Sequence, residues 1–124
     1  MFASLGHAPN SRRRLHTCGA TIKVKEDAID EAAKSVEGAM KVLLTGRGVA
    51  LSGEETAQPL WNLLRDNGVV PSQTEASILG ASRIRNAFGG HGAGAAPRSI
   101  PGGIPELAVQ AAATAIGYLA TLLP

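Results

Sequence analysis

Apolar residues recur every three or four positions between residues 26 and 44, which is the spacing of one face of an amphipathic helix. The sequence TGRG at 45–48 follows, and glycine accepts the left-handed conformation that closes a helix. The pattern therefore predicts a first helix over residues 26–44. Its expected buried positions are Ile29, Ala32, Ala33, Val36, Met40, Leu43 and Leu44.

Two further helices are predicted in the middle of the chain. The second begins at Pro59, whose fixed φ suits a first helical position, and it stops at Gly68. The third runs over residues 72–87 and ends at the glycine pair that follows. Its start carries Ser72 with Glu75 three residues later, which has the form of a capping box.

The C-terminal segment predicts a fourth helix, which starts near Pro105 and continues to the end of the chain. Glu106 lies in its first turn, where the helix dipole favours a carboxylate. The length would just cross a bilayer. However, the segment is rich in alanine, is interrupted by polar residues and lacks flanking basic anchors, so we predict no membrane contact. Small residues on every side favour a helix enclosed by protein, at a bundle centre or a subunit interface.

Between the third and fourth helices, the sequence HGAGAAPRSIPGG at 91–103 reads as loop. No segment alternates apolar and polar residues as a strand would, and no internal repeat is visible. The prediction is an all-α protein, a small four-helix up-and-down bundle. A chain of 124 residues fits one domain. Aromatic residues make up only 3% of it, so the core is aliphatic and thin, which favours burial against a second copy.

The N-terminal segment has a different composition from the rest. Its first 25 residues carry five lysines and arginines and no acid. We interpret residues 1–24 as a basic, disordered arm ahead of a helical domain at 25–124. An organellar transit peptide and the stub of a longer protein are the alternatives. The single cysteine, Cys18, excludes an internal disulfide and favours a reducing, cytoplasmic compartment.

The strongest chemical groups of the chain gather in RIRNAFGGHGAG, residues 83–94. Arginine offers a planar fork of donors that matches phosphate oxygens, and histidine titrates near neutrality. The glycines between them permit sharp turns, so Arg85 and His91 can address one point. A purely structural interpretation of this segment is also open. In that interpretation it is a glycine-rich turn in which His91 caps a carbonyl group and Asn86 stops the helix.

Other phosphate and metal sites are not supported by the sequence. No Gly-Lys-Ser/Thr follows the glycines and the preceding element is helical, which excludes a P-loop and a dinucleotide fingerprint. Metal binding is not predicted, because His7, His16 and Cys18 lie in the arm and His91 has no ligand partner at a standard spacing.

RNAFGGHG resembles the signature of HEPN-superfamily ribonucleases, an Arg and a His separated by four to six residues with a polar residue after the Arg. The order of segments resembles the abortive-infection C-terminal type more narrowly. The first helix is followed by PLWNLL at 59–64, then by the motif, and then by the alanine-rich helix at 107–123. The resemblance covers about residues 25–123.

The resemblance implies a dimeric helical bundle that cleaves RNA without metal or cofactor, as a toxin or phage-defence nuclease. Arg85, Asn86 and His91 would be catalytic. One His91 from each subunit would serve as base and acid, Arg85 would stabilise the charge on the phosphorane, and Asn86 would orient the phosphate or the imidazole. An antitoxin or regulatory protein is a further expected partner. Position 93 is alanine where some toxin members carry a modified tyrosine, which argues against regulation by that route.

Weaker candidates lie around this motif. Glu37 and Lys41 are expected to form an (i, i+4) pair on the first helix, near the active site. Arg83 and Arg98 are candidate contacts to the RNA backbone. Because Arg83 lies about 200° from Arg85 around a helix, we do not expect both to face one phosphate. The alternative function is a non-catalytic module, or a truncated remnant, that binds RNA, nucleotide or protein.

Overall fold

The computed structural model describes the backbone of residues 11–89 and 99–124 and the side chains of residues 21–89 and 99–124. Over these residues the protein is all-helical, with no strand. Its elements are α1 (Ser11–Gly46), α2 (Ala57–Asp66), the 3-10 turn η2 (Ser72–Thr74), α3 (Glu75–Ile78), α4 (Gly80–Phe88) and α5 (Ile104–Ala120).

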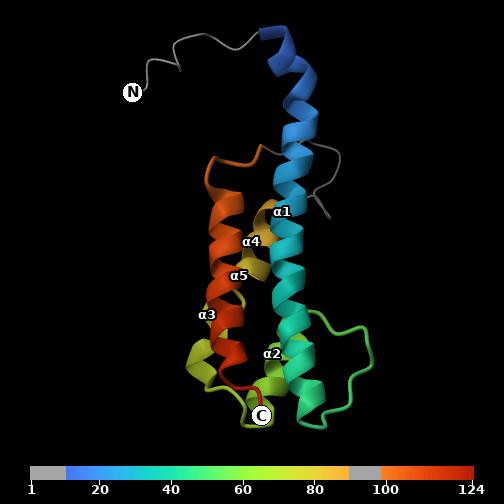
Figure 1. The fold of residues 1–124 in the computed structure, drawn as a ribbon, viewed down its shortest axis with the longest axis vertical. Coiled ribbons are helices and arrows are strands. Elements are labelled where there is room, and N and C mark those ends of the chain that lie inside the picture. The colour runs from blue at the N-terminus through green and yellow to red at the C-terminus, as the bar shows by residue number, and fades with distance from the viewer. Residues whose placement is uncertain (1–10, 90–98) are drawn as a thin grey trace.

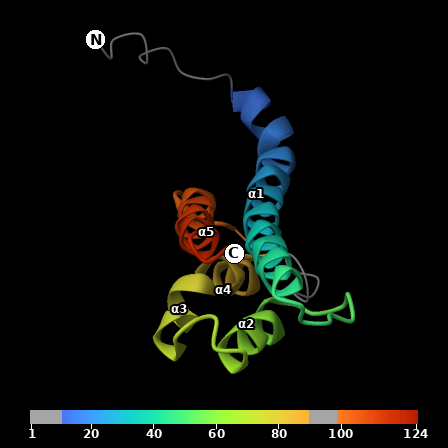
Figure 2. The same cartoon turned by 60° about the horizontal axis from the view of Figure 1, so that its bottom comes forward.

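α1 and α5 lie side by side and run in the same direction, while α2, α3 and α4 pack across one side of this pair (Figures 1 and 2). Contacts at both ends fix the parallel arrangement. Lys25 Nζ donates to the carbonyl of Ile100 at 3.2 Å, and Arg47 Nη2 donates to the carbonyl of Leu122 at 2.8 Å. The first and last helices of an up-and-down four-helix bundle are antiparallel, so the described helices depart from that topology.

The apolar face predicted for residues 26–44 is confirmed as the buried face of α1. All seven of its predicted positions are at most 6% exposed. α2 adds Leu60, Trp61 and Leu64, and the Trp61 ring nitrogen donates to Thr74 Oγ1 at 3.2 Å. This bond ties the turn before α3 to the core.

α1 begins at Ser11, earlier than the apolar pattern predicts. Residues 11–24, which the sequence assigns to a basic disordered arm, therefore have a helical backbone, and the start of α1 extends past the other helices (Figure 1). Periodicity marks only the part of a helix that packs against other elements. The three arginines, the lysine and the leucine of this segment have good helix propensity.

The third predicted helix is divided into η2, α3 and α4, and its capping box is absent. Neither Pro71 nor Thr74, the residues that precede η2 and α3, makes a side-chain capping bond. Glu75 instead accepts a hydrogen bond from Gln58 Nε2 at 2.9 Å. The division falls at Leu79, whose φ of −88° and ψ of 6° leave the helical region. The bend lets two consecutive apolar side chains, Ile78 and Leu79, both enter the core.

Within the chain α5 is buried on one face only, so it does not lie at the centre of a bundle, while its expected place at a subunit interface stays a prediction. Its core-facing residues are Ala108, Ala112, Ala115 and Leu119, whereas Leu107 and Val109 are about half exposed. Among the described helices, none is both long and apolar enough to cross a membrane.

The loop before α2 is closed by Glu55. Its carboxylate accepts hydrogen bonds from the backbone N–H groups of Ser52 at 2.8 Å and Gly53 at 3.0 Å. These bonds, with that of Ser52 the strongest, lower the pKa of Glu55 to about 2. The turn places Thr56 at the start of α2, facing α4.

Candidate functional site

α4 carries three of the predicted site residues, and Gly89 fixes the end of this helix. The Gly89 N–H donates to the Arg85 carbonyl at 2.6 Å. A Cβ atom at position 89 would lie 2.5 Å from that same carbonyl oxygen. Only glycine fits without a shift, so Gly89 holds the last turn of α4, and with it the backbone of Arg85. The predicted stop at the glycine pair is confirmed up to Gly89.

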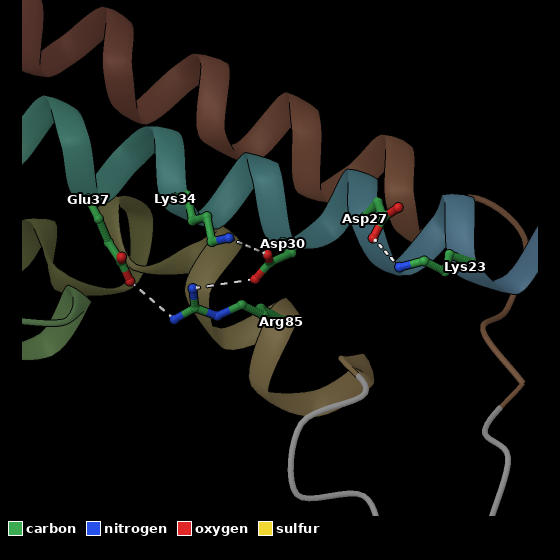
Figure 3. Close-up of polar contacts among 6 residues, drawn as sticks. All are labelled: Lys23, Asp27, Asp30, Lys34, Glu37 and Arg85. Atoms are coloured by element: carbon green, nitrogen blue, oxygen red, sulfur yellow. Dashed lines mark hydrogen bonds and ion pairs between the residues drawn. The ribbon is translucent and has the colours of Figure 1, made fainter.

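Arg85 reaches from α4 to α1, where its guanidinium lies between two carboxylates (Figure 3). Nη2 donates to Glu37 Oε2 at 3.1 Å, and Nη1 lies 3.9 Å from Asp30 Oδ1. The side chains of Arg85 and Glu37 are only 19% and 14% exposed. Hydrogen bonds between such charged, poorly solvated groups are stronger than those between neutral groups. The guanidinium is therefore held in one position.

Lys34 extends the cluster by a second ion pair on α1. Its Nζ lies 2.8 Å from Asp30 Oδ2, and Asp30 raises the pKa of Lys34 through this hydrogen bond and through its charge. Sequence reasoning missed Asp30 and Lys34. The signal was present, because residues 30, 34, 37 and 41 follow one another at spacings of four, three and four, which places them on one face of a helix.

The expected Glu37–Lys41 pair is not among the ion pairs of the described residues. Glu37 pairs with Arg85 instead, and Lys41 remains partly exposed on the same face of α1. The physical reason is geometric. Arg85 projects from a packed helix and offers a rigid fork of donors close to Glu37, whereas a lysine one turn away extends a flexible chain toward water.

A cavity of about 240 Å³ lies between the start of α2 and α4. Thr56 and Gln58 line it from α2, and Ser82 and Asn86 line it from α4. Both Arg83 and Arg85 also line it, although about 200° separates them around a helix, and the expectation that they do not both face one phosphate stays a prediction. Long side chains can reach one cavity from different sides of a short helix.

Arg83 is the more exposed of the two arginines and is held more loosely. Its only described ion pair is with Glu75, at 4.0 Å, and its side chain is 53% exposed. Asn86 is exposed at the mouth of the same cavity. The structure thus gathers Arg83, Arg85 and Asn86 at one cavity, with Glu37 behind Arg85.

His91 and Arg98 lie outside the described residues. The described chain stops at Gly89, next to Arg85, and resumes at Ser99. Ile100 is buried, and its carbonyl accepts the hydrogen bond from Lys25 of α1. Over the part of the chain that the structure describes, no three His, Cys, Asp or Glu side chains are grouped as a metal site would need.

Comparison with known proteins decides the family. The sequence model of the Abi_C family, described as a HEPN-like domain, matches residues 12–123. The chain belongs to this family of HEPN-like domains. The match begins in the helical segment before residue 25 and includes every helix described above. No curated protein and no solved structure gave a significant match.

The match includes the predicted motif residues Arg85 and Asn86 of this HEPN-like domain. Arg85 and Asn86 follow one another at the end of α4, and Gly89, where a Cβ atom would meet the Arg85 carbonyl, comes three residues after Asn86. Three polar groups surround one cavity: the guanidinium of Arg85, which is held in place, the exposed amide of Asn86 and the side chain of Arg83. Such a set has the chemistry to bind an oxyanion, and phosphate is the anion that a planar arginine fork matches best.

Proposed function

We propose that this HEPN-like domain is a metal-independent endoribonuclease of the phage-defence or toxin type. The observation that carries the proposal is the position of Arg85. A motif arginine is held by Glu37 and Asp30 beside a cavity that Asn86 also lines. A charged group fixed in advance stabilises a transition state without the cost of reorganising around it.

The reaction we propose is attack of a ribose 2′-OH on the adjacent phosphate. The 2′-oxygen forms a new bond to phosphorus, the bond to the 5′-oxygen breaks, and the products are a 2′,3′-cyclic phosphate and a 5′-hydroxyl. One His91 accepts the proton of the 2′-OH and a second His91, from another subunit, protonates the leaving oxygen. Arg85 stabilises the phosphorane charge, and Asn86 orients the phosphate.

The remaining candidates have supporting roles in the same proposal. Glu37 keeps Arg85 in position, and Lys41 lies on the same face of α1 as an accessory charge. Arg83 and Arg98 contact the RNA backbone. The active species is a homodimer in the cytoplasm, restrained by an antitoxin or regulatory protein.

A non-catalytic RNA-, nucleotide- or protein-binding module is the second candidate, and one observation favours it. The charge of Arg85 is already matched by Asp30 and Glu37, which is also the arrangement of a purely structural ion-pair cluster. The two candidates differ in what the loss of Arg85 does. In the structural case its loss affects folding alone, whereas in the catalytic case it abolishes cleavage by a folded protein.

Incubation of the purified protein with single-stranded RNA in EDTA tests the nuclease. We expect cleavage to a 2′,3′-cyclic phosphate by the wild type and by Arg65→Ala, which removes an exposed arginine on α2. Cleavage should fall at least a hundredfold in His91→Ala and Arg85→Ala. Arg85→Lys keeps the charge and should still lose most activity while remaining folded by circular dichroism. No cleavage by the wild type, or equal cleavage by all variants, would refute the proposal.

A further inference from the structure

Ser82 is the one buried polar side chain that this HEPN-like domain shows among its described residues. It is 8% exposed and lines the cavity between α2 and α4. None of the hydrogen bonds among the described residues involves its hydroxyl, and no fully buried side-chain oxygen or nitrogen there lacks a partner, so the hydroxyl is accessible from the cavity. Its polar group therefore faces a space in which a ligand atom can lie.

The first turn of α2 offers further donors at the same cavity. α2 has ten residues, and Thr56, which precedes it, makes no side-chain capping bond. The Leu60 N–H donates to the Thr56 carbonyl and Pro59 has no N–H, which leaves the N–H groups of Ala57 and Gln58 open among the described residues. Open N–H groups at the positive end of a helix dipole favour an anion.

The two arginines complete the lining. Arg83 and Arg85 both reach the cavity, while the carboxylates that pair with them, Glu75, Glu37 and Asp30, are not among its lining residues. At about 240 Å³ the space exceeds the roughly 30 Å³ that one water molecule occupies, so it can hold a phosphate group.

We propose that the end of this cavity at Ser82, Arg83 and the start of α2 is a subsite for the RNA phosphate adjacent to the one that is cleaved at Arg85 and Asn86. Ser82 and Arg83 lie about one helical turn, or roughly 5.4 Å, before Asn86 on α4. A strand whose reacting phosphate lies at Arg85 and Asn86 therefore places a neighbouring phosphate at Ser82, Arg83 and the start of α2. The identity of the ligand as RNA rests on the proposed nuclease function, whereas the binding of a phosphate group does not.

The test uses RNA binding in place of cleavage. In the His91→Ala background, fluorescence anisotropy measures the affinity for a short single-stranded RNA. We expect Ser82→Val to weaken binding about tenfold, the effect of one lost hydrogen bond to a charged group together with a partly filled cavity. The matched control is Ser77→Val, the same substitution at an exposed position of α3. It should leave the affinity unchanged.

A neutral methylphosphonate at the linkage next to the cleavage point tests the assignment to one phosphate. It should weaken binding to the Ser82 protein and have little further effect on Ser82→Val, because both changes remove the same contact. Inorganic phosphate should shift the amide resonances of Ala57 and Gln58, and the RNA should displace it.

The outcomes separate the subsite from the nuclease. Weaker RNA binding by Ser82→Val alone supports the subsite even if the wild type cleaves nothing, in which case only the nuclease fails. Equal RNA binding by both serine variants overturns the subsite even if the wild type cleaves RNA. The subsite is also overturned if RNA does not reverse the shifts that inorganic phosphate causes in the amide resonances of Ala57 and Gln58. Binding of free nucleotides in place of RNA overturns it as well.

Discussion

Arg85 is an arginine whose position is set by residues 48 and 55 places earlier in the chain. Its guanidinium, Glu37 and Asp30 share a poorly solvated position between α4 and α1. Removal of one partner from such a pair leaves the other charge incompletely compensated, which costs more than the loss of an exposed pair. The ion-pair cluster therefore links folding stability to the geometry of the candidate site.

Replacement of Glu37 by glutamine tests this link. We expect Glu37→Gln to lower the free energy of unfolding by about 1–2 kcal/mol, because the glutamine oxygen accepts only a neutral hydrogen bond from Arg85 and the longer contact to Asp30 is then its one ion pair among the described residues. Cleavage should fall as well, since the guanidinium is less fixed. Urea denaturation and the RNA assay measure the two effects.

The matched control is Asp27→Asn, the same change of carboxylate to amide on the same helix. Asp27 pairs with Lys23 at 3.4 Å, and both side chains are more than 60% exposed (Figure 3). The cost should be at most about 0.5 kcal/mol, with no change in cleavage. Equal effects of the two substitutions would show that burial of the Arg85 cluster has no energetic consequence.

Glycines 89 and 38 make a second contrast at the residue scale. Gly89→Ala places a methyl group 2.5 Å from the Arg85 carbonyl, so we expect a loss of about 1–3 kcal/mol and reduced RNA cleavage. Gly38→Ala on α1 meets nothing within 4 Å and should stabilise the protein by about 0.5–1 kcal/mol. Thermal melts of both variants measure whether each substitution raises or lowers the stability of the protein. A Gly89→Ala protein that is more stable than the wild type would contradict the claim that the end of α4 has no room for a Cβ atom at position 89.

The sequence predicted the residues of the candidate site that lie on α4, but it did not predict how residues of α1 pair with them. Arg85 and Asn86 could be predicted because the motif that contains them is local. Asp30 was missed, because helical spacing places it on the same face of α1 as Glu37 but does not show that this face meets α4, which depends on tertiary packing. For the same reason Glu37 was found with the wrong partner, since helical spacing favours Lys41 while packing supplies Arg85.

At the scale of elements, α1 and α5 approach each other through small side chains. Ala32 and Ala33 of α1 are buried, as are Ala108, Ala112 and Ala115 of α5. Small residues let two helix backbones come close, and added volume at such positions forces the helices apart. The alanine content of α5 therefore serves a packed face of the fold and carries no sign of a membrane span.

Adjacent alanines on α5 test this packing. Ala112 is 4% exposed and Ala113 is exposed. We expect Ala112→Leu to cost about 1–3 kcal/mol by overpacking, and Ala113→Leu to change stability by less than about 0.5 kcal/mol. Chemical denaturation of the pair, followed by fluorescence of the single Trp61, measures both. Equal tolerance of leucine at the two positions would mean that α1 and α5 do not pack closely.

The helices could be predicted in type and in approximate place, but their ends and directions could not. The apolar pattern located the buried part of α1 and the core residues of α2. It missed the first turns of α1, which precede the buried face predicted for residues 26–44, and the bend at Leu79, which serves the core. The parallel course of α1 and α5 depends on contacts between segments 75 residues apart, such as Lys25 with Ile100. No local pattern encodes such contacts.

For the whole molecule, the candidate site and an apolar groove between α1 and α5 lie on different sides of α1. A shallow groove between α1 and α5 is lined by Ala39, Val42, Ile116 and Leu123. Around α1, Ala39 is about 200° from Glu37. Two subunits that join through this groove would hold their Arg85 side chains apart. The proposed two-histidine site therefore requires a dimer that meets on the α4 side.

Mixing of subunits tests that requirement. When wild-type and His91→Ala chains are refolded together in equal amounts, about a quarter of the dimers carry two histidines. If each cleavage needs a histidine from both subunits, activity per wild-type chain falls to about half. If each subunit works alone, it stays unchanged. Asp27→Asn chains, which keep His91, serve as the control partner and should cause no loss. An unchanged activity in the His91→Ala mixture would place the whole reaction within one chain, where a single histidine would have to accept and return the proton in turn.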